Sequence, residues 1–471
     1  MRAVTFPLVI ALSAALAVPQ LYAKPALSNS HPAAEAQTLD LAKQLIAMRS
    51  VQGEGNRTGD TMRLLKSALV AGGWRDSDVQ ITPFTDTAYM IATWPGSDPA
   101  AKPLVISGHL DVVEAKPADW QRDPFTPIVE NGYLFGRGAS DMKYDAALAA
   151  SSLIELRRSG YKPRRTIVLQ FSGDEETTMR TSRAIAKQLS NAELVLNIDG
   201  GGGALDEKTG KPLYWTWQGA EKTYVDFQLE VTNPGGHSSA PRPVNAIVQL
   251  ATALERVGAY HFKPEVSPLT KAYFEQAAQF EGNANLAGAM HAFAANPADH
   301  AAAATLRASS SYVGKIGTTC VPTMISGGHA QNALPQRASA NINCRIFPGH
   351  SREAIAAELQ TAIGMPEVKL SDVTGGDSVS APASPMRPDF TAAVQKAIHL
   401  IHPGLPIFPS QASGASDSMW YRALGVPSYG ASPVFAKDSE DFSHGLNERI
   451  PLSNTGPGIT YYLSLLTDLS K

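Results

Sequence analysis

Short apolar runs alternate with longer amphipathic or Ala-rich segments along the chain before Thr223. The apolar runs are too short for helices and nearly continuous, which is typical of strands buried on both faces. Strands alternating with helices predict a parallel α/β sheet with helices on both faces. The predicted strands are 104–107, 166–171 and 194–198, and the predicted helices are 35–49, 58–71, 145–158 and 180–189.

The pattern changes near Thr223, where apolar–polar alternation predicts a strand with one exposed face. A helix, an Ala-rich helical stretch and two further strand candidates follow before the first pattern resumes. We therefore predict a smaller α+β domain, 222–350, inserted into a discontinuous α/β domain, 24–221 and 351–471. The segments behind this prediction are strand candidates 225–231, 322–325 and 337–347, helix candidates 244–257 and 351–363, the helical stretch 261–308, and the resumed pattern at 390–401, 426–429 and 460–469.

The N-terminus predicts export. An apolar stretch at 4–18 follows Arg2 and leads to Ala23, which is typical of a signal peptide over 1–23 and predicts a secreted or periplasmic protein. An N-terminal membrane anchor is the alternative, although the run is shorter than the ~20 residues that a spanning helix needs. We expect no stable membrane insertion after signal removal. A formal net charge of −3 gives no indication of nucleic-acid binding.

Cys320 and Cys344 are the only cysteines, and their spacing matches no zinc ribbon. They lie at equal distances in sequence from Asn332, so an antiparallel hairpin around that loop would place them opposite each other. Opposite residues of such strands lie about 4.5–5.5 Å apart, which is within disulfide range. We predict a disulfide, with two buried free thiols as the alternative.

Metal-ligand residue types follow three of the predicted parallel strands. His109 follows the first, Glu175 and Glu176 follow the second, and Asp199 follows the third. The carboxyl ends of parallel strands meet at one edge of an open sheet, where ligands bind. One acidic loop is common on any surface, but three such strand ends indicate a site. Of the two adjacent glutamates, one could bind metal while the other faces a water molecule.

Three further residues could complete this site. Asp111, two residues after His109, could accept the other ring N–H and fix its tautomer. Asp141 precedes a helix, so it is either an N-cap or a carboxylate that bridges two metal ions. His444 follows a later strand candidate. Histidine and carboxylate ligands without cysteine suit zinc in a hydrolytic site, with cobalt or manganese as alternatives.

Together these motifs resemble those of the di-zinc metallopeptidase family of aminoacylase, carnosine dipeptidase, glutamate carboxypeptidase, carboxypeptidase S and succinyl-diaminopimelate desuccinylase. The resemblance covers nearly the whole chain after the signal, in the family's order. It implies two zinc ions bridged by Asp141, with His109 and Asp199 on one ion and Glu176 and His444 on the other. The motifs are SGHLDVV (107–113), GRGASDMK (136–143), GDEE (173–176), NIDG (197–200), GGHSS (235–239), NALP (332–335) and HG (444–445).

The resemblance also implies the catalytic roles. Glu175 is the expected general base, Asp111 orients His109, and His237 stabilises the tetrahedral oxyanion. Two zinc ions about 3.5–4 Å apart lower the pKa of a shared water toward ~7. Glu175 then takes its proton and passes it to the leaving amine. In the family the histidine that corresponds to His237 lies on the inserted domain, often that of the partner subunit. We therefore expect a homodimer through this lid or dimerisation domain, and closure of the domains during catalysis.

Four residues give an expectation about the substrate. Arg345 lies where family members place a substrate-binding arginine, and a guanidinium suits bidentate carboxylate binding. Asn332 could supply an amide to the scissile carbonyl or the carboxylate, and the loop with Gly414 and Ser416 could add backbone N–H groups. We therefore expect a free carboxylate next to the cleaved amide. The stretch 261–308 resembles that of the carboxypeptidase S branch, which favours an apolar residue or acyl group on the amino side.

Two rival functions fit the residues less well. A non-catalytic binding protein on the same fold would have lost ligands, whereas the ligands and the base are present here. A barrel amidohydrolase needs His-x-His at its first strand, whereas His109 is followed by Leu110 and Asp111. The expected activity is a zinc metallopeptidase of carboxypeptidase or dipeptidase type. It would act on dipeptides, short peptides or N-acyl amino acids, and an N-acyl amino acid deacylase is the alternative.

Overall fold

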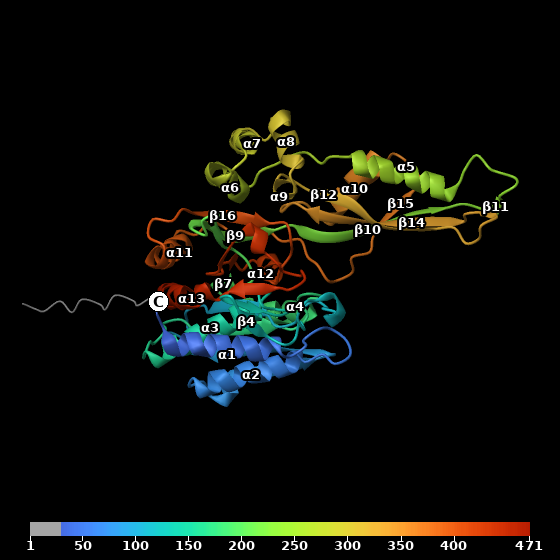
Figure 1. The fold of residues 1–471 in the computed structure, drawn as a ribbon. Coiled ribbons are helices and arrows are strands. Elements are labelled where there is room, and N and C mark those ends of the chain that lie inside the picture. Colours follow the sequence, from blue (N-terminus) through green and yellow to red (C-terminus); the bar gives the residue numbers. More distant parts are fainter. Residues whose placement is uncertain (1–29) are drawn as a thin grey trace, which may run out of the picture.

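The computed structural model describes residues 30–471, so the predicted signal peptide at 1–23 lies outside the described residues. Figure 1 shows a large α/β domain and an elongated lid domain that projects from it. Within residues 30–471, no helix is both long enough and apolar enough to cross a bilayer.

The large domain is built on a mixed sheet of ten strands, ordered β1-β2-β6-β3-β7-β17-β9-β8-β18, with β16 paired to β9. At its centre β6, β3 and β7 lie side by side and run parallel. All residues of β3 and β6 are buried, which explains their continuous apolar pattern. The strands are β1 (Val79–Phe84), β2 (Thr87–Trp94), β3 (Leu104–His109), β6 (Ile167–Ser172), β7 (Leu194–Asn197), β8 (Gly202–Leu205), β9 (Pro212–Glu221), β16 (Ile407–Ala412), β17 (Ser428–Gly430) and β18 (Phe435–Ala436).

Helices cover both faces of this sheet, which confirms the predicted α/β fold class. Leu104 and Ile106 pack into the cluster under α1, α3 and α13, whereas Val105 between them packs with α4 and α12 on the other face. A small antiparallel sheet, β19-β5-β4, accompanies the large one. These elements are α1 (Pro32–Ile46), α2 (Thr58–Ala71), α3 (Lys143–Arg158), α4 (Arg180–Gln188), α11 (Pro388–Ile401), α12 (Ser418–Ala423), α13 (Thr455–Leu469), β4 (Ile128–Glu130), β5 (Tyr133–Phe135) and β19 (Arg449–Pro451).

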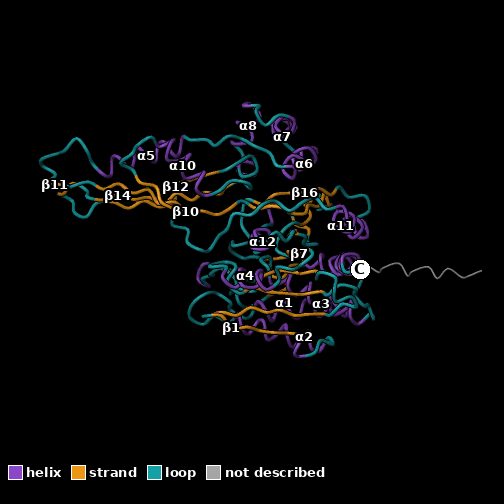
Figure 2. Tube along the Cα trace, turned by 180° about the vertical axis from the view of Figure 1, so that it is seen from behind, coloured by secondary structure: helices purple, strands orange, loops and turns teal. Residues whose placement is uncertain are grey.

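The lid is a four-stranded antiparallel sheet, ordered β12-β14-β10-β15, with two helices on one face (Figure 2). Alternate residues of β10 are buried under these helices, as its apolar–polar alternation predicts. A two-stranded ribbon, β11 with β13, extends from the sheet. The lid elements are β10 (Thr223–Thr232), β11 (Gly236–His237), α5 (Ala246–Ala259), β12 (Thr319–Gly327), β13 (Ala333–Leu334), β14 (Arg337–Ile346), α10 (Arg352–Ile363) and β15 (Lys369–Asp372).

The lid boundaries differ from the predicted 222–350 in two ways. First, α10 and β15 belong to the lid, because Ile355 and Leu359 pack in its core and β15 pairs with β10. Second, four helices inside the predicted insertion dock on the large domain, where Phe274 and Phe293 pack with Phe408 of β16 (Figure 1). These helices are α6 (Pro268–Ala277), α7 (Ala284–Ala295), α8 (His300–Arg307) and α9 (Ser310–Val313).

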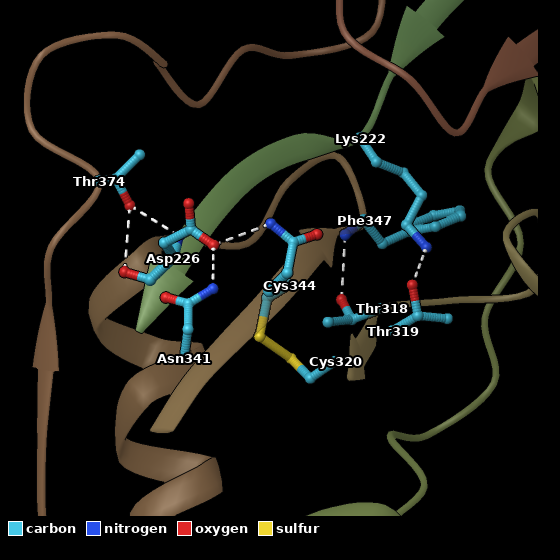
Figure 3. Close-up of a disulfide and its surroundings, with 10 residues drawn as sticks. Lys222, Asp226, Thr318, Thr319, Cys320, Asn341, Cys344, Phe347 and Thr374 are labelled. Carbon is cyan, nitrogen blue, oxygen red and sulfur yellow. Dashed lines mark hydrogen bonds between the residues drawn. A yellow bond between two sulfur atoms is a disulfide. The ribbon is translucent and has the colours of Figure 1, made fainter. Parts of the chain in front are cut away.

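The predicted disulfide between Cys320 and Cys344 is confirmed (Figure 3). The two cysteines are direct partners in the antiparallel pairing of β12 with β14, and their Cα atoms lie 4.1 Å apart. The bridge therefore joins neighbouring strands of the lid, as the placement around Asn332 predicts.

Candidate active site

Histidine and carboxylate side chains gather where the central strands of the large sheet end. His109 is the last residue of β3, and Glu176 follows β6, the strand next to it. Asp141 lies two residues before the first residue of α3, next to its N-cap Met142. Potential ligand atoms of His109, Asp141 and Glu176 all lie within 4.8 Å of one another. Strand order therefore brings together residues that are far apart in sequence.

The Asp141 carboxylate lies between the two predicted histidine ligands. Its Oδ1 is 3.1 Å from Nε2 of His109, and its Oδ2 is 3.2 Å from Nε2 of His444. His444 Nε2 also lies 2.9 Å from Glu176 Oε2, and His109 Nε2 lies 3.7 Å from Asp199 Oδ2. The five predicted ligands thus form two groups that share Asp141. This is the arrangement expected of a carboxylate that bridges two cations.

The titration of these groups reflects their mutual proximity. Although burial alone would raise it, the pKa of Asp141 is lowered by the hydrogen bonds from His109 and His444. Hydrogen bonds to Asp141 and Glu176 raise the pKa of His444 to about 10. Burial, followed by the charge of Asp141, raises the pKa of Asp199 well above its usual range. Protons on His444 and Asp199 therefore relieve part of the repulsion between the carboxylates. Bound cations would relieve it in the same way.

Asp111 holds both the first ligand and the predicted base. Its backbone oxygen lies 3.0 Å from Nδ1 of His109, so Nδ1 can keep the proton and leave Nε2 for a metal ion. Its carboxylate accepts the backbone N–H groups of Glu175, at 3.1 Å, and of Glu176, at 2.9 Å. One carboxylate thus fixes the turn that presents both glutamates.

Glu175 is buried beside this cluster. Burial and the nearby carboxylates of Asp199 and Asp417 raise its pKa well above the usual range, while His109 acts in the opposite direction. Bound cations would lower it again. A carboxylate in such surroundings can accept a proton readily, which is the property that a general base requires.

Glu448, which no sequence motif marks, is fully buried and organises the loop before Asp141. Its Oε1 accepts the backbone N–H groups of Ser140 and Asp141, at 2.7 and 2.9 Å. Its Oε2 accepts from Arg137 Nη1, at 2.6 Å, and from the N–H of Gly138, at 3.1 Å. Since Glu448 closely follows His444 in the chain, it joins the loops that carry two of the predicted ligands.

We predict that Glu448→Gln weakens metal binding by roughly 10–100-fold, the usual cost of losing a group that supports metal ligands. The amide nitrogen of glutamine cannot accept a hydrogen bond, so it cannot replace the oxygen that accepts from Arg137 and from the Gly138 N–H. The Asp141 loop therefore loses part of its support. Competition titration against a chelator measures the affinity. The exposed Glu54→Gln is the control, and an unchanged affinity in Glu448→Gln would refute the role.

Two residues predicted to act in catalysis or substrate binding lie far in space from the metal-ligand cluster of the same chain. His237 belongs to β11, and Figure 1 shows β11 at the end of the lid away from the large domain. Asn332 lies beside it, because its backbone oxygen accepts the N–H of Ser238 at 3.0 Å. Both side chains are exposed. The structure therefore brings His237 and Asn332 together with each other and not with the ligands of their own chain.

The other predicted substrate-binding residues lie on both domains. Arg345, on β14, faces away from the lid helices, and its guanidinium lies 4.7 Å from the ring centre of Tyr224. Gly414 is exposed in the loop after β16. Ser416 differs from its predicted role, because its N–H already donates to Glu221 and its hydroxyl accepts from Asn197. In this structure Ser416 supports the strand end before Asp199 and offers no free N–H to a substrate.

Comparisons with known proteins agree with this geometry. Residues 105–468 match the model of peptidase family M20/M25/M40. The N-fatty-acyl-amino acid synthase/hydrolase PM20D1 of Xenopus tropicalis is 28% identical over 381 residues, which cover 79% of this chain and 73% of that protein. The M20 family metallo-carboxypeptidase Sso-CP2 of Sulfolobus solfataricus shares the fold, with a TM-score of 0.70 and 18% identity over 92% of this chain and 98% of that one.

A dinuclear metal binding peptidase from the M20 family, YXEP of Bacillus subtilis, also shares the fold, with a TM-score of 0.59 and 11% identity over 94% of this chain and 100% of that one. Carboxypeptidases, dipeptidases and an N-acyl amino acid hydrolase are thus among the similar proteins. The chain belongs to the M20/M25/M40 peptidase family and is a metallopeptidase-type, carboxypeptidase-like hydrolase.

Proposed function

We propose that this chain is a two-zinc hydrolase that cleaves amide bonds in dipeptides, short peptides or N-acyl amino acids with a free carboxyl end. The observation that carries this proposal is the Asp141 carboxylate, with one oxygen at His109 and the other at His444. A shared carboxylate between two ligand groups, beside a buried glutamate, suits a hydrolytic centre with two metal ions.

The donor set fits such ions. Among residues 30–471, no lysine or arginine forms an ion pair with Asp141, Glu175, Glu176 or Asp199. Four clustered carboxylates without a lysine or arginine partner repel one another, and divalent ions would relieve this repulsion. His109, Asp141 and Asp199 would hold one ion, and Asp141, Glu176 and His444 the other. Such ions act as Lewis acids and lower the pKa of bound water.

The protein's own groups supply the proton transfer and the geometry. Glu175 takes a proton from the attacking water and delivers it to the nitrogen of the leaving amine. The carboxylate of Asp111 keeps Glu175 in place by accepting the backbone N–H of Glu175. The backbone oxygen of Asp111 keeps the ring of His109 oriented. When water adds to the scissile carbonyl carbon, negative charge develops on the carbonyl oxygen, where a positioned donor lowers the barrier.

We further propose that His237 supplies this donor from the partner subunit of a homodimer. Support comes from its exposed position at the end of the lid and from β12, an edge strand of the lid sheet that pairs with β14 on one side. Apolar side chains are exposed along β12 and on the neighbouring helix α5, including Met324, Ile325 and Val248, which are 72%, 67% and 62% exposed. An exposed apolar strand edge is a surface that pairs readily with a second copy.

The substrate proposal rests on Arg345 and on the names of similar proteins. Arg345 has no carboxylate partner within ion-pair distance among residues 30–471, so its charge is available for a substrate carboxylate. The curated relatives include an N-fatty-acyl-amino acid hydrolase and a probable carboxypeptidase S-like protein. Both names describe substrates with an amide next to a carboxylate, and the first favours N-acyl amino acid deacylation as the second candidate.

We predict that wild-type enzyme prefers a dipeptide with a free carboxylate over the same dipeptide with a C-terminal amide. Arg345→Ala should lower kcat/KM for the free acid roughly 10–100-fold, the usual value of a charge-assisted hydrogen bond, and leave the amide unaffected. Arg337→Ala, on the same strand and face, is the matched control. Equal kcat/KM for acid and amide in the wild type would refute the carboxylate anchor.

We also propose that the mature protein acts outside the cytoplasm. The N-terminal pattern at 1–23 and the Cys320–Cys344 bridge support this location, because disulfides persist in secreted and periplasmic compartments.

A further inference from the structure

Three cationic side chains gather where the chain passes from the large domain into the lid. Lys222 is the single residue between β9 and β10, and it is 1% exposed. Its Nζ donates to Oγ1 of Thr319 at 2.9 Å (Figure 3). Thr319 and Arg345 are direct partners on β12 and β14, so their side chains share one face of the lid sheet. The ammonium of Lys222 therefore lies on the face that carries Arg345.

The third cation, Lys315, contacts the large domain next to Lys222. Its Nζ donates to the backbone oxygen of Gln411 at 3.2 Å, and the N–H of Lys222 donates to the oxygen of Ala412 at 3.3 Å. Both lysines thus meet the end of β16, a strand of the large domain. Burial, then the positive charges of Arg345 and Lys315, lower the pKa of Lys222 to about 7.

No carboxylate of residues 30–471 forms an ion pair with any of these three cations. The neighbouring Glu221 pairs with Arg422 instead, at 2.9 Å. The side-chain amide of Gln411 is buried as well, and neither its nitrogen nor its oxygen has a hydrogen-bond partner. Unpaired charge and unsatisfied polar groups at a buried junction destabilise the free protein, which favours a role in binding an anion.

The cluster is connected to the metal-ligand end of the sheet. The N–H of Asp199 donates to Asn197 Oδ1, and Asn197 Nδ2 donates to Ser416 Oγ, both at 2.9 Å. The N–H of Ser416 donates to Glu221 Oε2 at 3.1 Å, and Lys222 is the next residue. A short chain of hydrogen bonds thus links a predicted metal ligand to the lysine.

We propose that Lys222 and Lys315 complete, with Arg345, a carboxylate site that binds the free carboxyl group of the substrate. This inference rests on the proposed function, and adds two binding residues from the junction of the domains. Because Arg345 belongs to the lid and Lys315 is attached to β16, a bound carboxylate links the lid to the large domain. The free carboxylate therefore positions the substrate and fixes the closed arrangement of the two domains together.

The test uses metal-loaded, full-length Lys222→Met and Lys315→Met, with the exposed Lys263→Met from the same connecting region as control. A dipeptide and its C-terminal amide are the two substrates. Each cluster variant should raise KM for the free acid about tenfold or more, with kcat within about twofold, and leave the amide unchanged. Equal losses for acid and amide would show a structural role and overturn the inference.

Thermal melting provides a second measurement. Lys222→Met removes an unpaired buried charge, so this variant should melt at or above the wild-type temperature. The free amino acid product should raise the melting temperature of wild type and not that of Lys222→Met. If Lys222→Met does not fold, Lys222→Gln takes its place in both experiments. If wild type prefers the acid and both cluster variants keep that preference, only this inference fails; if wild type shows no preference, the proposed carboxylate anchor fails with it.

Discussion

Glu175→Gln is expected to lower kcat by about 10²–10⁴-fold, because the amide cannot take a proton from the attacking water. The substitution preserves the shape of a buried side chain, and the backbone N–H of Glu175 remains bound to Asp111. The metal content should therefore stay at the wild-type level. Steady-state kinetics beside elemental analysis of the same preparation separates loss of the base from loss of metal.

Asp141→Ala is the contrasting variant. Its carboxylate contacts both histidines, so its removal should release both ions and abolish activity through metal loss. A Glu175→Gln enzyme with wild-type turnover would reject Glu175 as the base. A Glu175→Gln enzyme that has lost its metal would make Glu175 a structural residue.

The clustering of the predicted ligands could be anticipated because their spacing in sequence reflects sheet topology. His109, Glu176 and Asp199 each follow a strand with a continuous apolar pattern, and those strands proved to be adjacent and parallel. Asp141 was harder, since a carboxylate before a helix is commonly an N-cap. Its predicted role depends on two histidines that contact its two oxygens. Only the family resemblance and the structure indicate that these histidines lie there.

Glu448 could not be found from local pattern. It lies 307 residues after Asp141, and nothing in its neighbourhood distinguishes a buried acceptor of several hydrogen bonds from a surface glutamate. The same holds for Glu221, whose partner Ser416 lies 195 residues away in sequence and whose partner Arg422 lies slightly further along the chain. Buried polar groups must find partners, but sequence alone does not indicate which ones.

Strand β16 was missed for a different reason. Its sequence contains Pro409, which removes a backbone donor and argues against a strand in a central position. In the structure β16 pairs only with β9, so the proline is tolerated at a position with one partner strand. The lid boundary was misplaced because helix and strand patterns at 352–372 resemble those of either domain. Only pairing with β10 assigns that segment.

The second large effect expected is that His237→Ala lowers kcat by about 10²–10³-fold, the usual cost of losing an oxyanion donor. His237 is exposed at the end of the lid, so a merely structural histidine there would be dispensable. Its Nδ1 accepts the N–H of Ser239 at 3.1 Å, which leaves Nε2 as the free ring nitrogen for a substrate oxygen. His329→Ala, also exposed on the lid, is the control.

Complementation distinguishes donation within one chain from donation across a dimer. His237→Ala and Glu175→Gln chains, co-expressed with different tags, form mixed dimers in which one site has both Glu175 and the partner's intact histidine. Random pairing should restore about a quarter of wild-type activity, although each variant alone is inactive. A mixture that stays inactive, while each variant remains dimeric and metal-loaded, would place the donor within its own chain or reject it. Recovery would show that the active site needs two copies of the chain, as expected for a residue at the end of the lid away from the predicted metal ligands of its own chain.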